Sequence, residues 1–270
     1  MSDTVAYRVS TPLTLDGSLS DPAWQAVPKS SGFVDMATGQ PALLDTKCAV
    51  LWDDRNLYVG FWIEEPFPTA TQTERDSLIF RENDIEVFID GGDCYYEFEL
   101  NALNTVYEVF FIWRDAYTRG SRFDIPEFDL VDRAAYSFGG NFDRTEDHFW
   151  VGTHPRGTRW AFLDWDFPGM QSAVHIDGHL NDRSKPSKGW TAMIIFPWAG
   201  MKHLAGGRSL PPNEGDVWKL FLGRFQKIEI GAEQVQAAWC LSAHGVYDTH
   251  MPDNFTPFRF THLVAGEPQP

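Results

Sequence analysis

The sequence predicts an all-β fold built as an antiparallel β-sandwich. Short runs of alternating apolar and polar residues recur along the chain, and turns rich in Gly, Pro and Asp separate them. Hardly any segment has the helical period of about 3.6 residues, which favours a sandwich over a mixed fold. The chain has 270 residues, of which 43% are hydrophobic and 15% aromatic, enough to bury a sizeable core. Sandwiches of this length often form one domain, so we expect residues 1–270 to be a single domain.

The first elements are a short helical turn and a hairpin. In "LDGSLSDPAWQAVP", Asp21 is suited to cap a helix that begins at Pro22, with Trp24 and Val27 facing inward. In "CAVLWDDRNLYVGFWIEE", two strand-like runs flank a turn at residues 53–56. Leu57 and every second residue after it form the apolar side of the second run.

The segment "NDIEVFIDGGDCYYEFELN", Asn83 to Asn101, predicts a second hairpin with residues 91–94 as its loop. Alternate side chains of a strand point to opposite faces. One face is therefore apolar, formed by residues 85, 87, 89, 96, 98 and 100. The other face carries acidic groups, and the register sets Glu86 directly opposite Glu99.

Like charges directly opposite each other destabilise a sheet, so the pair needs compensation. A guanidinium from Arg81, Arg114 or Arg224 could fork between Glu86 and Glu99. A bound Ca²⁺, which prefers carboxylate oxygens, is a second answer, and a protonated carboxyl acting as a general acid is a third. A wet face on which solvent screens the pair is the fourth. We take the arginine bridge as the working hypothesis.

The remainder of the chain reads as further strands around one long irregular segment. "TVYEVFFIW" is β-rich, but periodicity fades from Arg114 to about Asp164. Strand patterns resume at "SAVHIDGHL", "GWTAMIIFPW", "DVWKLFLGRFQ" and "QVQAAWCLS". A loop this long inside a compact domain is often functional. We expect residues 114–164 to be an insertion that folds over the sandwich and lines a cleft.

The charge excludes two classes of partner. Lys and Arg number 22 against 38 Asp and Glu, a net charge of -16, which repels phosphate backbones and anionic membrane surfaces. Nucleic acid and membranes are therefore not expected partners, and the oligomeric state is left open. The chain as given shows no leader, which predicts a cytoplasmic protein, or a secreted or periplasmic one if a leader was removed.

Common enzyme and metal motifs are missing. Cys48, Cys94 and Cys240 are odd in number and lack metal-type spacing, so neither a disulfide framework nor a zinc site is indicated. The sequence has no G-x-S-x-G, P-loop or dinucleotide fingerprint. Of the eleven tryptophans, we assign four to packing: Trp24, Trp52, Trp190 and Trp218.

Six segments together carry a family resemblance. "LDGSLSDPAW", "VLWDDRNLYVGF", "NDIEVFIDGG…YYEFELN", "GWTAMIIFPW", "GDVWKLFLGRF" and "HMPDNFTPFRF" occur in an order that resembles family 9 carbohydrate-binding modules and their DOMON-like relatives, from Leu15 to Phe260. The resemblance implies a jelly-roll sandwich that holds a sugar on its polar concave face. It also implies calcium ions in loops, for which the "DGGD" turn at residues 90–93 is a candidate, and an association with polysaccharide-degrading enzymes.

The family's sugar-binding positions are only partly matched. Glu86 and Asn101 fall where such modules keep a Glu and an Asn. Arg81 stands where they keep one aromatic wall, Thr249 where they keep the other, and Glu99 where they keep an Arg. Other aromatic residues could supply a platform: Tyr95, Trp113, Trp160, Trp165, Trp239 or Tyr247.

The resulting hypothesis is non-catalytic binding of a carbohydrate or related polar small ligand, associated with polysaccharide degradation. Glu86 would accept hydrogen bonds from the sugar, Asn101 would donate and accept, and Arg224 would balance charge. The full set of predicted binding residues is Glu86, Glu99, Asn101, Arg81, Arg224, Trp165 and His250. One alternative is a glycoside hydrolase or lyase that uses Glu86 and Glu99 beneath the 114–164 insertion. Another is a protein-interaction domain with no small ligand. No cofactor is certain, and calcium is kept as a candidate.

Overall fold

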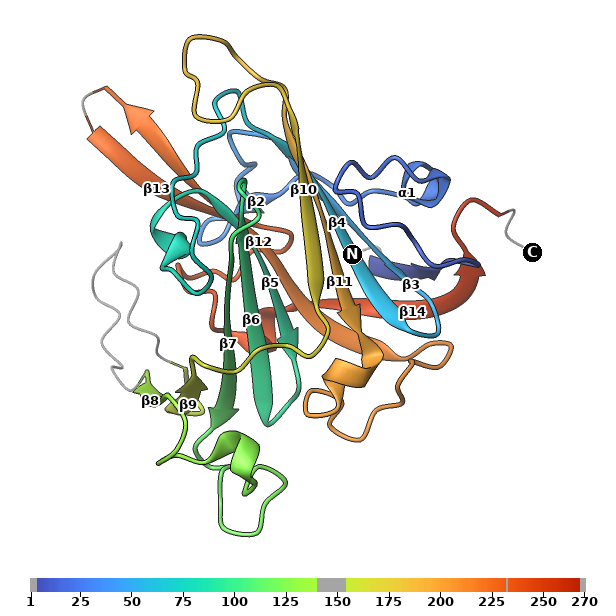
Figure 1. Ribbon diagram of the computed structural model, residues 1–270, viewed down its shortest axis with the longest axis vertical. Coiled ribbons are helices and arrows are strands. Elements are labelled where there is room, and N and C mark those ends of the chain that lie inside the picture. The colour runs from blue at the N-terminus through green and yellow to red at the C-terminus, as the bar shows by residue number, and fades with distance from the viewer. Residues whose placement is uncertain (1–3, 140–153, 232, 268–270) are drawn as a thin grey trace.

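The computed structural model describes residues 4–139, 154–231 and 233–267, which form a β-sandwich (Figure 1). Among them, the helical turns are α1 (Pro22–Ala26) and the 3-10 turns η1 (Ile79–Arg81), η2 (Pro126–Phe128), η3 (Trp198–Met201) and η4 (Pro252–Asn254). The strands are β1 (Thr4–Arg8), β2 (Val34–Asp35), β3 (Thr46–Trp52), β4 (Asn56–Glu64), β5 (Asp84–Asp90), β6 (Cys94–Asn101), β7 (Val106–Trp113), β8 (Ala135–Phe138), β9 (Arg159–Phe162), β10 (Gln171–Asp177), β11 (Gly189–Pro197), β12 (Val217–Ile230), β13 (Glu233–Cys240) and β14 (Thr256–Val264). The predicted all-β class is confirmed.

The two layers of the sandwich are joined along one edge. One layer contains the strand order β10-β11-β4-β3, the other β12-β5-β6-β7, and β1 and β14 connect them in one hydrogen-bonded path (Figure 1). The main core lies between the layers. The rings of Phe98 on β6 and Phe196 on β11, for example, meet edge to face with centroids 5.6 Å apart. This core covers one face of the β12-β5-β6-β7 layer, and the site described below lies on its other face.

The hairpin of β5 and β6 has the predicted register. Asp84 pairs with Asn101, Glu86 with Glu99 and Asp90 with Tyr95. The predicted apolar face, including Val87, is buried in the main core. The acidic side chains therefore emerge together on the outer face, as the period of two requires.

The first predicted elements are also confirmed. The Asp21 side chain accepts a hydrogen bond from the Ala23 amide and caps α1, whose Trp24 is buried. Strands β3 and β4 pair antiparallel around the predicted turn at residues 53–56. The four tryptophans assigned to packing are all buried.

The described part of the 114–164 segment contains regular structure as well as loops. Strand β9 pairs with β7, and β8 pairs with β9, so the segment extends the β12-β5-β6-β7 layer sideways. Phe128 of η2 is buried in the main core. The described part of the segment therefore packs along one side of the sandwich, while residues 140–153 lie outside the described residues. That residues 114–164 are an insertion stays a prediction.

In the described residues, no helix is long and apolar enough to cross a membrane. That residues 1–270 form a single domain stays a prediction.

Candidate ligand-binding site

A pocket of about 230 Å³ opens on the outer face of the β12-β5-β6-β7 layer. Strands β5, β6, β7, β12 and β13 supply its floor, and the segment before η4 covers part of that floor. The residues that line it are Phe80, Glu86, Glu97, Glu99, Tyr107, Phe138, Phe225, Gln236, Tyr247, Asp248, Thr249 and His250. The pocket is therefore lined by a set of acidic side chains and a set of aromatic side chains.

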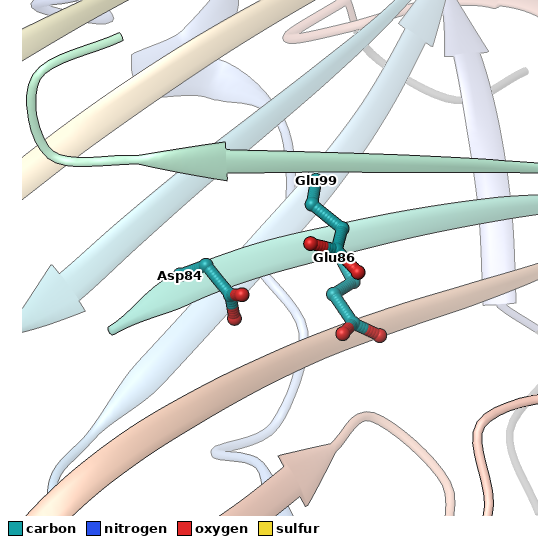
Figure 2. A group of neighbouring side chains, drawn as sticks. All are labelled: Asp84, Glu86 and Glu99. Carbon is teal, nitrogen blue, oxygen red and sulfur yellow. The ribbon is translucent and has the colours of Figure 1, made fainter. Parts of the chain in front are cut away.

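The acidic floor follows from the hairpin register. Glu86 and Glu99 face each other across β5 and β6, while Asp84 and Glu97 lie on the same face. All four carboxyl groups are buried. Oxygen atoms of Asp84, Glu86 and Glu99 lie within 4.8 Å of one another, and Figure 2 shows these side chains gathered beside one another where β5 meets β6.

Burial raises the pKa of every carboxyl group in this floor, because the charged form loses its hydration. The pKa of Glu86 lies well above its ordinary value, through burial and then through the charges of Asp84 and Glu97. The pKa of Glu99 is likewise raised by burial and by its acidic neighbours. The pKa of Glu97 is raised by burial to about 8, although its hydrogen bond with Glu99 and the Arg159 charge act in the opposite direction. That hydrogen bond raises the pKa of Glu99 and lowers that of Glu97.

The predicted arginine bridge is wrong for Arg224. In the register of β12 and β5, Arg224 pairs with Ile85 and so points to the core side of the layer. Its guanidinium donates to Thr46 Oγ1 at 2.9 Å, to the Glu64 carbonyl at 2.9 Å and to the Gln226 side chain at 2.6 Å. The sheet itself separates this cation from Glu86.

The other two predicted cations also serve elsewhere. The exposed Arg81 has its guanidinium carbon 5.9 Å from the centre of the Phe80 ring, and Arg114 lies 4.5 Å above Trp160. Neither arginine lines the pocket. Within the described part of the chain, Glu86 Oε2 and Glu99 Oε2 have no hydrogen-bond partner. The compensation that we predicted for the pair is therefore not supplied by these arginines.

Asn101 is used to hold the turn between β6 and β7. Its Nδ2 donates to the Gln72 carbonyl and to Glu82 Oε1, while its Oδ1 accepts from the amides of Leu103 and Thr105. The side chain is fully buried and does not line the pocket. We therefore correct its expected role from ligand contact to turn stabilisation.

Trp165 also lies away from the pocket. It is 3% exposed, its ring packs against Tyr96 and Phe110 on the core side, and its Nε1 donates to Glu127. The polar surroundings of this tryptophan in the sequence suggested exposure. They failed as a guide because residues distant in the chain, not its neighbours, cover the ring.

His250 does line the pocket, as part of a buried polar network. Its Nδ1 is 3.0 Å from the Tyr95 hydroxyl, and its Nε2 is 3.8 Å from Glu97 Oε1. Arg159 donates to the same hydroxyl and to the His250 carbonyl. Burial and then the Arg159 charge lower the pKa of His250 well below its usual value, so the imidazole is neutral.

The aromatic wall consists of five half-buried rings, those of Phe80, Tyr107, Phe138, Phe225 and Tyr247. Only Tyr247 was among the platform candidates from the sequence. Two others could have been found by extending the alternation across the sheet, because Tyr107 pairs with Glu99 and Phe225 with Asp84. Arg159 and Phe138 were missed because the 114–164 segment lacks such a period.

The turn at residues 90–93 suits a calcium ion less well than the carboxyl groups of the pocket floor do. In the "DGGD" turn, Asp90 accepts from the Gly92 amide and Asp93 pairs with Arg156, so one oxygen of each carboxylate is already engaged. The group formed by Asp84, Glu86 and Glu99 offers close carboxylate oxygens of the kind that Ca²⁺ prefers. This group would be the one to hold such an ion.

Comparisons with known proteins support the predicted resemblance. A family model described as "Carbohydrate family 9 binding domain-like" matches residues 15–110, which include the whole β5–β6 hairpin. No curated protein matches the sequence at a significant level. The resemblance predicted from the six sequence segments is confirmed over the matched residues.

Solved structures share the fold at low identity. The crystal structure of a protein from Bacteroides uniformis ATCC 8492 has a TM-score of 0.55 at 12% identity, and the match covers 95% of this chain and 97% of that one. A family 9 carbohydrate-binding module from Caldicellulosiruptor kristjanssonii in complex with cellotriose has a TM-score of 0.52 at 11% identity, covering 99% and 98%. A family 9 module from the same organism in complex with glucose has a TM-score of 0.51 at 11% identity, covering 99% of this chain and 100% of that one. These matches confirm the β-sandwich of family 9 modules.

Proposed function

We propose that this protein binds carbohydrate, without changing it chemically, in the pocket over Glu86 and Glu99. The observation that carries the proposal is the pairing of an aromatic wall with a floor of buried carboxyl groups in one pocket. The family match over residues 15–110 and the two sugar complexes of family 9 modules support the same ligand class.

The chemistry of the pocket suits a sugar ring. Aromatic rings such as Tyr247 and Phe80 can pack against the apolar C–H face of a pyranose. The carboxyl groups of Glu86 and Glu99 can accept hydrogen bonds from its hydroxyl groups, and a protonated carboxyl can also donate. A buried polar group gains most from such a partner, because leaving it unpaired costs free energy.

The biological setting that we propose is polysaccharide degradation. A module of this kind would hold a sugar end for an enzyme that acts on the chain. The family resemblance is the support for this context.

The hydrolase alternative is favoured by the raised pKa of Glu86 and Glu99, since a glycosidase needs one protonated carboxyl. The arrangement argues against it. Retaining glycosidases place two carboxyl groups on either side of the scissile bond, about 5 to 5.5 Å apart. Here the two groups stand on neighbouring strands of one floor, with oxygens within 4.8 Å. We therefore prefer binding.

Isothermal titration calorimetry with monosaccharides and oligosaccharides, glucose and cellotriose included, tests the proposal. We expect a saturable isotherm for at least one neutral or charged sugar, lost in Glu86→Gln and in Tyr247→Ala. The matched control is Glu267→Gln, an exposed carboxylate near the end of the described chain. A reducing-sugar assay runs in parallel, and release of product would favour the hydrolase. Binding to no sugar would overturn the proposal.

A further inference from the structure

The charged groups that face the pocket are all acidic in the described residues. Glu86, Glu97, Glu99 and Asp248 line it, and no Lys or Arg does. His250 is neutral because burial lowers its pKa. Arg159 acts on Glu97, but its guanidinium is held by the Tyr95 hydroxyl and the His250 carbonyl. Of the charge-bearing side chains described, the pocket thus presents only acidic ones, and a cation that enters it would favour their charged forms.

Two of these carboxyl groups have an oxygen that lacks a partner among the described residues. Glu86 is 2% exposed and Glu99 is 1% exposed, and the Oε2 atom of each has no hydrogen-bond partner in the described part of the chain. Burying a polar oxygen without a donor is costly, so such atoms call for an explanation. A ligand that brings N–H donors to this point would give both oxygens a hydrogen-bond partner. A positive charge on the ligand would also compensate the repulsion between the two carboxyl groups.

The aromatic wall stands close to these carboxyl groups. Tyr107 pairs with Glu99 in the register of β6 and β7, and Phe225 lies two residues along β12 from Gly223, which pairs with Glu86. An organic cation is attracted to the negative face of an aromatic ring, and the attraction is stronger when water is excluded. Aromatic rings beside carboxyl groups are therefore suited to bind an ammonium group on a ring that has an apolar C–H face.

We propose that the pocket selects a sugar that carries a free amino group, with its ammonium placed between Glu86 and Glu99. This inference rests on the proposed carbohydrate function and narrows it to cationic amino sugars. The ammonium would donate to the Oε2 atoms of the two glutamates, and the pyranose ring would pack against the wall formed by Tyr107, Phe225 and Tyr247.

A divalent cation is the rival occupant of the same acidic floor. The group formed by Asp84, Glu86 and Glu99 could coordinate one. Ca²⁺ takes six to eight oxygen ligands, usually including backbone carbonyls. Here all three acidic residues lie within paired strands, where the backbone carbonyls serve the sheet. The five aromatic rings of the wall would also add nothing for a hydrated metal ion, so we favour the ammonium.

Calorimetry of the full chain with three sugars of the same ring tests this inference. Glucosamine carries the ammonium, N-acetylglucosamine replaces it by a neutral amide, and glucose replaces it by a hydroxyl. We expect glucosamine to bind about tenfold or more tightly than either neutral sugar near pH 7. Glu99→Gln should remove that preference, whereas the matched surface change Glu267→Gln should keep it.

The outcomes separate the inference from the function on which it rests. Equal or tighter binding of glucose or N-acetylglucosamine would overturn the amino-sugar preference and leave carbohydrate binding standing. If CaCl2 binds in the same pocket, is lost in Glu99→Gln and blocks glucosamine, the floor is a metal site and the inference fails. If no sugar binds while every variant keeps its circular dichroism spectrum and melting temperature, both fail together.

Discussion

Glu86 and Glu99 face each other across β5 and β6, each with one oxygen that has no partner among the described residues, in a layer whose buried Arg224 points the other way. Two acidic side chains in this arrangement repel each other when both are charged. The fold tolerates them because burial favours the neutral, protonated forms. Burying two carboxyl groups without partners costs free energy of folding. Such a cost is typical of functional sites, because a bound ligand can offset it.

The stability of the protein should fall between about pH 4.5 and pH 8. The folded-state pKa of Glu97 is raised from 4.5 to about 8 by burial, so the folded state binds a proton that the unfolded state has lost in this range. The contribution is fully present below the unfolded pKa and is lost as the pH rises through the folded pKa. Thermal melts from pH 4 to pH 9 measure it.

Glu97→Gln should flatten this pH profile, because the amide does not titrate. Its melting temperature should exceed that of the parent protein at pH 9, with a smaller difference at pH 4.5. A steeper profile in the variant would contradict the assignment of the titration to Glu97. The exposed change Glu267→Gln should leave the profile as it was.

Trp165→Ala should destabilise the fold by about 3 to 5 kcal/mol, because it empties a buried site in the core. Tyr247→Ala, on the half-buried pocket wall, should cost much less stability and should weaken sugar binding. Urea unfolding and calorimetry on the two variants measure both properties. The reverse pattern would place the sugar platform at Trp165.

Asn101→Ala should cost about 2 to 4 kcal/mol, because four hydrogen bonds that fix the turn after β6 are lost. Hydrogen exchange should increase at the amides of Leu103 and Thr105, which then lose the acceptor that Asn101 provides. A variant of normal stability that no longer binds sugar would instead assign Asn101 to the ligand.

Arg224→Met should destabilise the protein by about 3 to 5 kcal/mol, because it removes a buried cation from the neighbourhood of Glu65. Ligand affinity should stay within about twofold in the folded variant, since the side chain lies on the core side of the layer. Chemical unfolding with calorimetry checks this. Lost affinity with unchanged stability would return Arg224 to the site.

Local alternation in the sequence is enough to predict most of the main strands, the register of the β5–β6 hairpin and the face on which each of its side chains lies. The period of two is a local property, so the residue pattern alone is enough to place Glu86 and Glu99 opposite each other. The same period in "WKLFLGR" sets Arg224 on the side of Leu220 and Leu222, which is the core side of the layer. The position of this arginine was therefore also predictable from local alternation.

Which surfaces form the pocket depends on the packing of segments that are distant in the chain. The segment from Tyr247 to His250 covers the outer face of β5 and β6, and Phe138 joins it from the 114–164 segment. Trp165 became core and Asn101 became part of a turn through contacts with residues far along the chain. Local alternation fixes which way a side chain points, but it carries no information on which distant segment will cover it. That depends on the packing of the two layers and their loops, where the burial that shifts the pKa of Glu86, Glu97 and Glu99 also arises.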